Sequence, residues 1–562
     1  MIKKYIYVIL PSVLLVVVSC KKQLDINADP NNPTEIGSSK LLTKAELQLG
    51  NSLAIGNGLS QTLSVYTHQL VVREDEDSYK ATGSTFAIQQ AWNGLYINTL
   101  SNLDAIIKQS SEKNETKYVG IAKVLKAYAY SQLVDVFGDV PFSESHSLKA
   151  GLFYPKFDKG SSIYPALFTL LDDALSNLNA ATANPTSPGN DDVIYKGSVT
   201  KWVKAANTIK LKLLLQQRKV KNVATEVNAL LTSGNLISAT NEGFLLPYGP
   251  NGATDDRNPG FGDYYASQRS NYISPWFYET LKGLNQYINT GITDPRLPYY
   301  FYNQLGPTSA GTQKTEYRDG AFVSIYFSTN GPDRGANQQD NMTLLGMYPV
   351  GGKYDDGSGI TTGKITASSG TGAAPYRFIT YADRLFMEAE LIKEGVISGD
   401  ARAKFKEAMT EAFKQVDYVI TTYVKPTQTV PAIYNTGAMS AMTNYINAIL
   451  AQYDANPSKQ LQSIMTQKGI CSFGSAVDAD TDYRRTGFPV MFDPTNSTMA
   501  PGGIVQPPLA GDPTMSPQDK IQIVTPLNYP LTLPWYQSEL ESNINAPKQK
   551  IDPSTYKPFW LP

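Results

Sequence analysis

The segment DVIYKGSVTKWVKAANTIKLKLLLQ, residues 192–216, decides the fold class of this chain. Its apolar positions recur at three- and four-residue spacing: Trp202, Ala206, Ile209 and Leu213, widened by Leu211, Leu214 and Leu215. This spacing predicts a helix over 199–220 with one broad apolar face. Because so wide a face has to be covered by other elements, we expect the helix to lie at the centre of its domain.

Similar patterns extend in both directions from this helix. They predict helices over 40–72, 84–109, 116–137, 161–180 and 222–233. Further along, Thr380 and Asp383 have the spacing of a capping box, and Gly395 suits the end of the helix that follows. Paired helices of this length are typical of a tetratricopeptide-like superhelix, although the strict 34-residue consensus is absent. We therefore expect one large, mostly α-helical domain.

The middle of the chain has a different composition. Residues 248–301 contain 12 aromatic side chains in 54 positions, mixed with Gly, Asn, Asp and Pro, and residues 351–374 contain seven glycines. Compact domains rarely keep long irregular loops without a functional reason. We therefore expect residues 234–375 to be loop-rich and to face the ligand.

Composition excludes several functional classes. The 562 residues include 49 basic and 50 acidic side chains, so a protein that binds nucleic acid through its phosphates is excluded. Only 18% of the residues are charged and 35 are Tyr, which suits neutral ligands that carry hydroxyl or amide groups. With two Cys and two His, the chain lacks the ligand set of a structural zinc site, and no serine nucleophile motif or phosphate loop is present. We expect no cofactor and no catalysis.

The first residues predict the compartment. Lys3 and Lys4 precede an apolar run over 5–18, which is too short to span a membrane and is typical of a secretory signal peptide over 1–19. Ser19 and Cys20 then resemble a bacterial lipobox, in which Cys20 carries the lipid; the alternative is an ordinary signal peptide with an accidental cysteine. Residues 20–36 read as the lipid anchor and an extended spacer, and 37–562 as the folded domain.

Six segments carry a family resemblance, and they occur in order along the chain. They are LDINADPNNPT (24–34), AYAYSQLVDVFGDVPFSE (127–144), the 192–216 segment with Trp202 and Asn207, DPRL (294–297), DYRRTGFP (482–489) and WYQSELESN (535–543). Together they resemble the SusD/RagB family of outer-membrane nutrient-binding lipoproteins, most closely its second SusD-like branch. Residues 471–479 lack the expected tryptophans, and the loops over 234–375 match nothing in the family.

The resemblance implies a non-enzymatic protein built on tetratricopeptide-like helix pairs. Such proteins lie on the cell-surface face of the outer membrane of Gram-negative bacteria. They cover a SusC-like TonB-dependent barrel transporter and capture an oligosaccharide or, in some members, an oligopeptide. The motifs are mainly scaffold motifs, so they transfer no ligand-binding residues.

The residues themselves suggest where a ligand binds. Six side chains in the aromatic-rich segment are candidates for a stacking platform: Tyr264, Tyr265, Arg269, Tyr272, Trp276 and Tyr278. Aromatic rings stack on the C–H face of a sugar or on flat peptide groups, and an arginine donates to hydroxyls and carbonyls. The alternative is that these rings pack beneath a long loop.

Two acidic segments suggest other chemistry. Asp478, Asp480 and Asp482 begin like a calcium loop, but Tyr483 stands where Gly is needed and Pro489 where Glu is needed. Arg484 and Arg485 beside Asp482 favour a buried structural ion pair or a loop clamp over a ligand site. The alternative to a binding protein is a surface glycoside hydrolase with paired carboxylates, for which the 74–77 run Glu-Asp-Glu-Asp is the candidate.

Overall fold

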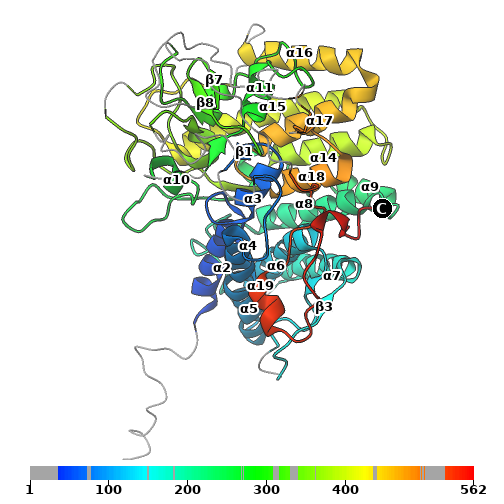
Figure 1. Cartoon of the computed structure of the whole chain (residues 1–562). Helices are drawn as coiled ribbons and strands as arrows, with labels where there is room; N and C mark the ends of the chain where they lie inside the picture. The colour runs from blue at the N-terminus through cyan, green and yellow to red at the C-terminus, as the bar shows by residue number, and fades with distance from the viewer. Residues whose placement is uncertain are drawn as a thin grey trace, which may run out of the picture.

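The computed structural model describes residues 36–562 except 73–76, 148–150, 182–183, 267–268, 270, 308–315, 329–339, 361–362, 435–439, 494, 497–498 and 500–525. The predicted signal peptide, Cys20 and the spacer up to residue 35 therefore lie outside the described residues. Figure 1 shows a helical lower half, a second set of helices at the upper right and a loop-rich region at the upper left.

The first helical set comes mainly from the N-terminal half. Its helices are α2 (Ser38–Leu53), α3 (Leu59–Tyr66), α4 (Phe86–Asn93), the π-helix η1 (Gly94–Leu100), α5 (Ser101–Glu112), α6 (Thr116–Phe137), α7 (Gly160–Asn179), α8 (Val199–Gln217) and α9 (Ala224–Ser233). Successive helices pack side by side, α5 on α6, α6 on α7 and α7 on α8. The tetratricopeptide-like helix pairing is confirmed, and Trp202 of α8 is fully buried at its centre.

The predicted single helix over 40–72 is wrong, because the chain turns between α2 and α3. Gly56 adopts a φ of +102°, and a Cβ atom on it would lie 2.7 Å from the Pro259 carbonyl oxygen. Only glycine allows this left-handed conformation together with so close an approach. The turn therefore places the end of α2 directly against the 255–265 segment.

The second helical set and the C-terminal segment follow the loop-rich region. Their helices are α14 (Tyr381–Lys393), α15 (Ala401–Val419), η4 (Ile420–Val424), α16 (Ala441–Ala455), η5 (Pro457–Lys459), α17 (Gln460–Cys471), α18 (Val477–Thr486), α19 (Gln537–Ser542) and η8 (Pro553–Thr555). The predicted capping box is confirmed at the start of α14, where Thr380 accepts from the Asp383 N–H and Asp383 accepts from the Thr380 N–H.

The loop-rich region contains only short elements. They are η3 (Thr240–Glu242), β4 (Phe244–Leu246), α10 (Phe261–Tyr265), β5 (Tyr272–Ile273), α11 (Pro275–Lys282), α12 (Leu297–Tyr300), β6 (Phe301–Tyr302), β7 (Tyr317–Asp319), β8 (Phe322–Ser324), β9 (Leu344–Leu345), α13 (Met347–Val350) and β10 (Tyr376–Ile379), with β1 (Leu70–Val71), β2 (Val140–Pro141) and β3 (Phe157–Asp158) elsewhere. The strands form two-stranded antiparallel pairs: β1 with β5, β2 with β3, β4 with β10, β6 with β9 and β7 with β8.

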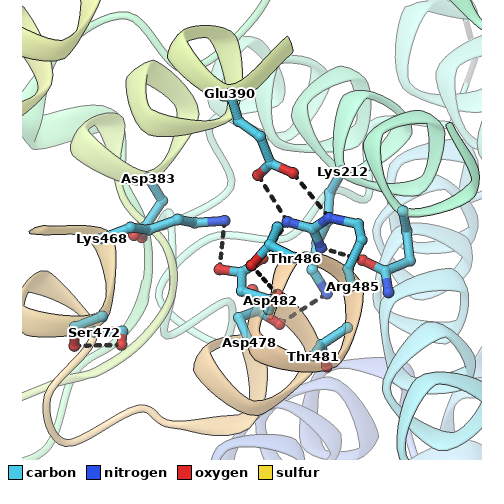
Figure 2. Close-up of polar contacts among 12 residues, drawn as sticks. Lys212, Asp383, Glu390, Lys468, Ser472, Asp478, Thr481, Asp482, Arg485 and Thr486 are labelled. Atoms are coloured by element: carbon cyan, nitrogen blue, oxygen red, sulfur yellow. Dashed lines mark hydrogen bonds and ion pairs between the residues drawn. The ribbon is translucent and has the colours of Figure 1, made fainter. Parts of the chain in front are cut away.

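A buried ionic network ties the two helical sets together (Figure 2). Glu390 of α14 accepts from Arg485 of α18 at 2.9 and 2.7 Å. It also forms an ion pair with Arg218, just after α8, at 2.9 Å. Arg485 also pairs with Asp482, which in turn pairs with Lys468 of α17 at 2.7 Å. The sequence interpretation of Arg485 and Asp482 as a buried structural ion pair is therefore confirmed.

Candidate ligand-binding cleft

Five of the six predicted platform residues lie in the interior. The exposed fractions are 2% for Tyr264, 4% for Arg269, 3% for Tyr272, 5% for Trp276 and 6% for Tyr278. The four aromatic rings among them belong to a hydrophobic core between the loop-rich region and the second helical set. The structure therefore does not place these five side chains on an exposed stacking platform, and they pack as the alternative interpretation expected.

The polar atoms of these buried side chains have protein partners. The Tyr278 hydroxyl donates to Asp319 at 2.7 Å while its ring stacks on Phe322, with centroids 3.8 Å apart. The Trp276 indole donates to the Val490 carbonyl at 3.2 Å. A buried ring can keep a polar tip when that tip is hydrogen-bonded, which is the physical reason why this Tyr-rich segment forms a core.

Tyr265 is the exception, because it remains partly exposed and lines an open cleft. We call this the α10 cleft; its volume is about 420 Å³, and its lining residues are Asn51, Gly56, Asn57, Asp255, Arg257, Asn258, Pro259, Gly262, Asp263, Tyr265, Ala266 and Asn271. Small-molecule sites usually have volumes of roughly 300–1,000 Å³. The α10 cleft is therefore large enough for part of an oligomeric ligand.

One wall of the α10 cleft combines an aromatic ring with a guanidinium group. Arg257 donates to the Tyr265 hydroxyl at 3.0 Å and to the Asp255 carboxylate at 3.2 Å. Its guanidinium carbon also lies 5.4 Å from the centroid of the Tyr265 ring and 5.5 Å from that of Phe261. These contacts fix the Tyr265 ring in the lining of the cleft.

A second wall of the cleft is the turn between α2 and α3. The Gly56 N–H donates to the Gln61 side chain at 3.1 Å, and the Gln61 amide donates to Asn271 at 2.5 Å. The Asn271 N–H in turn donates to Asp263 at 3.1 Å. This chain of hydrogen bonds joins the α2–α3 turn to the segment after α10 and holds the two walls together.

The chemistry of the α10 cleft suits an uncharged, hydroxyl- or amide-bearing ligand. Asn51, Asn57 and Asn271 supply amides, and Asp255, Asp263 and Arg257 supply carboxylate acceptors and a guanidinium donor. The described residues of the predicted Gly-rich loop over 351–374 do not line the cleft. They pack behind it, where the Gly372 carbonyl accepts from the Asn258 N–H at 2.7 Å.

Sequence reasoning missed most of this lining. It selected Tyr265 but not Asp255, Arg257 or Asp263, which belong to the run DDRNPGFGD over 255–263. The density of Asn, Asp and Arg beside glycines in this run was the available indication, because such residues favour turns and also supply hydrogen-bonding groups. Asn51 and Asn57 reach the cleft because the chain turns at Gly56. The helix predicted over 40–72 has no turn there, so the sequence did not indicate that these two residues line the cleft.

The segment with Asp478, Asp480 and Asp482, which begins like a calcium loop in sequence, forms the helix α18. Asp478 pairs with Lys212 at 2.9 Å, Asp480 with Arg484 at 2.7 Å and Asp482 with Lys468 at 2.7 Å. Residues two apart on a helix point to different sides, so the three carboxylates do not converge. Among the described residues, no group of three or more His, Cys, Asp or Glu side chains is arranged to hold a metal ion.

Of the four carboxylates proposed for the hydrolase alternative, only Asp77 belongs to the described residues. Residues 74–76 lie outside the described part of the chain, and Asp77 is buried, where it accepts from the Ser328 N–H at 2.8 Å. Cys471 is buried, and burial raises the pKa of its thiol to about 12. A thiol protonated at neutral pH is a poor nucleophile.

The architecture defines the class of protein: a helical-repeat scaffold that carries a loop-rich region. The family model described as SusD-like, "Starch-binding associating with outer membrane", matches residues 30–506, and the chain belongs to this family. Within the described residues of 36–562, no helix is both long and apolar enough to cross a membrane.

Solved structures share the whole fold. A SusD homologue from Bacteroides fragilis NCTC 9343 is 18% identical with a TM-score of 0.64, covering 94% of this chain and 99% of its own. A chitin-binding protein is 20% identical with a TM-score of 0.63, covering 91% and 95%. A SusD/RagB family protein from Bacteroides thetaiotaomicron VPI-5482 is 20% identical with a TM-score of 0.61, covering 94% and 99%. No curated protein matches the chain.

Proposed function

We propose that this protein captures an oligomeric nutrient, an oligosaccharide or an oligopeptide, in the α10 cleft and passes it unchanged to a SusC-like TonB-dependent barrel transporter. The observation that carries the proposal is the open polar cleft, in which the Tyr265 ring lies among amides and a guanidinium group. Membership of the SusD-like family and the likeness to a chitin-binding structure support capture of a glycan.

The proposed location follows from the N-terminus. Lipidation at Cys20 would hold the protein at the outer membrane of a Gram-negative bacterium, on the cell-surface face. Residues 20–36 would then act as a spacer between the lipid and α2. A tethered binding protein brings a nutrient to the surface but not across the membrane, so the proposal includes the barrel transporter as a partner.

Gly262 offers a direct test of the α10 cleft. It is exposed within α10, it lines the cleft, and a Cβ atom built on it meets nothing within 4 Å. The substitution Gly262→Leu should therefore fill the cleft without disturbing the fold. We expect it to weaken binding of the recognised oligosaccharide or oligopeptide at least about tenfold, or about 1.4 kcal/mol.

The measurement is titration calorimetry of the protein lacking residues 1–20 against panels of neutral oligosaccharides and uncharged oligopeptides. Gly189→Leu is the matched control, because its nearest neighbour is 3.9 Å from the added Cβ and it lies outside the cleft. Chromatography of the recovered ligand should show no shorter products; their appearance would favour the hydrolase. Equal affinity in the Gly262→Leu variant would place the site elsewhere.

A further inference from the structure

A groove of about 710 Å³ lies between the last three helices of the first helical set. We call it the α7–α9 groove: residues of α8 form its floor, and α7 and α9, which both pack on α8, form its walls. Among the described residues, it shares no lining residue with the α10 cleft. In Figure 1, α7 and α9 lie at the right of the molecule and α10 lies at its left. The groove and the α10 cleft are therefore separate cavities.

The floor of the groove follows from the sequence of α8. Four lining residues recur there at three- and four-residue spacing, so they lie on one face of the helix: Asn207, Lys210, Leu214 and Gln217. The step from Asn207 to Gln217 advances about 15 Å along the helix axis. Leu214 therefore lies between one amide side chain at each end of the floor.

Apolar side chains from both walls add to Leu214. Pro165 and Phe168 come from α7, and Ala229 and Leu230 come from α9. Small-molecule sites are lined mainly by apolar side chains, have volumes of roughly 300–1,000 Å³, and carry a few placed polar groups. The groove has the size and the apolar lining of such a site.

The two ends of the floor differ in their hydrogen bonding. At one end the Asn207 side-chain amide donates to the Asn235 carbonyl at 3.0 Å, which joins α8 to the segment after α9. At the other end Gln217 is only 7% exposed, and its Nε2 has no hydrogen-bond partner among the described residues. A buried donor without an acceptor costs free energy, so an acceptor on a bound molecule would be stabilised at this end.

The charged side chains that line the groove pair with each other. Lys210 of α8 pairs with Asp172 of α7 at 2.6 Å, and Lys221 pairs with Glu226 of α9 at 3.0 Å. The two cations and two anions have no net formal charge. A charged ligand would have to compete with these pairs, whereas an uncharged ligand leaves both intact.

We propose that the α7–α9 groove binds an uncharged amphiphilic small molecule, which has an aromatic or aliphatic body and a carbonyl or hydroxyl oxygen at one end. The body packs on Phe168, Leu214 and Leu230, and the oxygen accepts from the Gln217 amide. This site is additional to the nutrient site of the α10 cleft, and its occupation does not depend on the proposed function.

Two other occupants fit the groove less well. A partner helix would bring an apolar stripe along the whole floor, and this stripe would cover the amides of Asn207 and Gln217 at the two ends. An oligosaccharide carries hydroxyl groups along its whole length, whereas Leu214 and Leu230 offer only aliphatic surface in the groove. A short apolar body with a polar end matches both parts of the lining.

The test uses prodan, an uncharged naphthalene with a propionyl carbonyl, whose fluorescence moves to shorter wavelength in an apolar site. It is titrated into the protein lacking residues 1–20, which retains every described residue. Ala229→Trp fills the groove from an exposed position of α9, and Asn228→Trp is the matched control at the adjacent exposed position outside the lining. Gln217→Leu removes the amide donor and keeps a side chain of similar size.

We expect prodan to bind wild type and Asn228→Trp equally, and Ala229→Trp at least about tenfold more weakly, with melting temperatures unchanged. Gln217→Leu should bind about three- to tenfold more weakly, and its bound prodan should emit at shorter wavelength because the carbonyl has lost its donor. A purely structural role of Gln217 would not change the emission of the bound probe.

The inference is overturned if wild type does not bind prodan, or if Ala229→Trp binds it as wild type does. Unchanged emission in Gln217→Leu would contradict the hydrogen bond that defines the ligand class. Gly262→Leu, which fills the α10 cleft, should bind prodan normally, and a loss there would place the probe in the nutrient site and overturn the inference. Failure of the α10 cleft to bind a nutrient leaves these prodan results unchanged, so the two proposals fail separately.

Discussion

At the scale of single residues, the 192–216 segment owes its importance to Asp192. This buried carboxylate accepts from the Trp202 indole at 2.7 Å and from the Tyr195 and Gly197 N–H groups at 2.9 and 2.8 Å. Glu46 of α2 lies beside it, fully buried, and accepts from the Val193 N–H at 2.7 Å. Two acidic side chains thus share the centre of the first helical set.

The Glu46 side chain should make stability depend on pH. Burial, followed by the nearby Asp192 charge, raises the pKa of Glu46 well above its usual value. In the unfolded chain Glu46 ionises at about pH 4.3, so the contribution of its protonated side chain to folding stability is fully present below that pH. This contribution is lost as the pH rises toward the higher pKa that Glu46 has in the folded protein. Glu46→Gln removes this loss, so the variant should gain stability relative to wild type between about pH 5 and about pH 8.

Urea unfolding at both pH values measures this effect through the difference in midpoint between variant and wild type. Glu112→Gln, at the exposed end of α5, is the control and should give the same difference at both pH values. A Glu46→Gln difference that does not change with pH would contradict a protonated Glu46 in the folded protein.

Residue types alone did not distinguish the ring that lines the cleft from the buried rings. Tyr264 and Tyr265 are adjacent in α10, yet Tyr264 is 2% exposed and Tyr265 lines the α10 cleft. Both environments favour a ring with a polar tip, and the α10 helix alone determines which of the two points inward. The segment predicted from the sequence contains one ring that lines the cleft, and the local fold determines which ring that is.

At the scale of elements, helix positions followed from apolar spacing wherever neighbouring helices cover the apolar face. The helix predicted over 116–137 is α6, with the same bounds, and Gly138 ends it with a φ of +80°. The prediction failed at Gly56, because the α2–α3 turn depends on contact with Pro259, more than 200 residues away in sequence. Long-range contacts of this kind leave no local pattern.

Gln61 of α3 is the residue that holds this turn against the α10 cleft. Replacing it with Ala leaves the Gly56 N–H and the Asn271 side-chain oxygen without their present partners, at a cost of about 1 kcal/mol. We expect Gln61→Ala to weaken ligand binding roughly three- to tenfold, because the two cleft walls are no longer fixed.

Calorimetry with the ligand that the wild-type protein binds gives the change in affinity, and thermal unfolding reports the accompanying change in stability. Gln89→Ala removes a comparable side-chain bond, to Tyr536 at 3.4 Å, far from the cleft and should leave affinity unchanged. Normal binding by the Gln61→Ala protein would show that the turn is not part of the site.

At the scale of the whole molecule, the fold consists of two hydrophobic cores that meet at the ionic network. Trp92, Trp202, Trp535 and Trp560 belong to the first core and Trp276 to the second. The sequence predicted the helical scaffold around both cores, because apolar residues at three- and four-residue spacing indicate helices. It did not predict the positions of the short elements within 234–375. Strands such as β7 and β8 are too short to show a periodic pattern, and they form by pairing with each other.

Glu390 is the carboxylate on which this connection depends. Burial alone would raise its pKa, but the charges of Arg485 and Arg218 hold the pKa of Glu390 below its usual value. Glu390→Ala leaves Arg218 and part of the Arg485 guanidinium buried without this partner, and breaking a buried pair costs about 3–5 kcal/mol. We therefore expect a large drop in the denaturation midpoint and looser coupling between the two cores.

Two probes followed in parallel measure that coupling. Tryptophan fluorescence reports mainly on the first core, which holds four of the five Trp residues, whereas far-ultraviolet circular dichroism reports on helices of both. The wild-type transitions should coincide, and those of Glu390→Ala should separate. Asp454→Ala, which removes the exposed partner of Arg402, is the control and should leave the transitions coincident. Coincident transitions in Glu390→Ala would contradict this prediction. The two cores would then unfold together without the Glu390 carboxylate, and packing alone would join them.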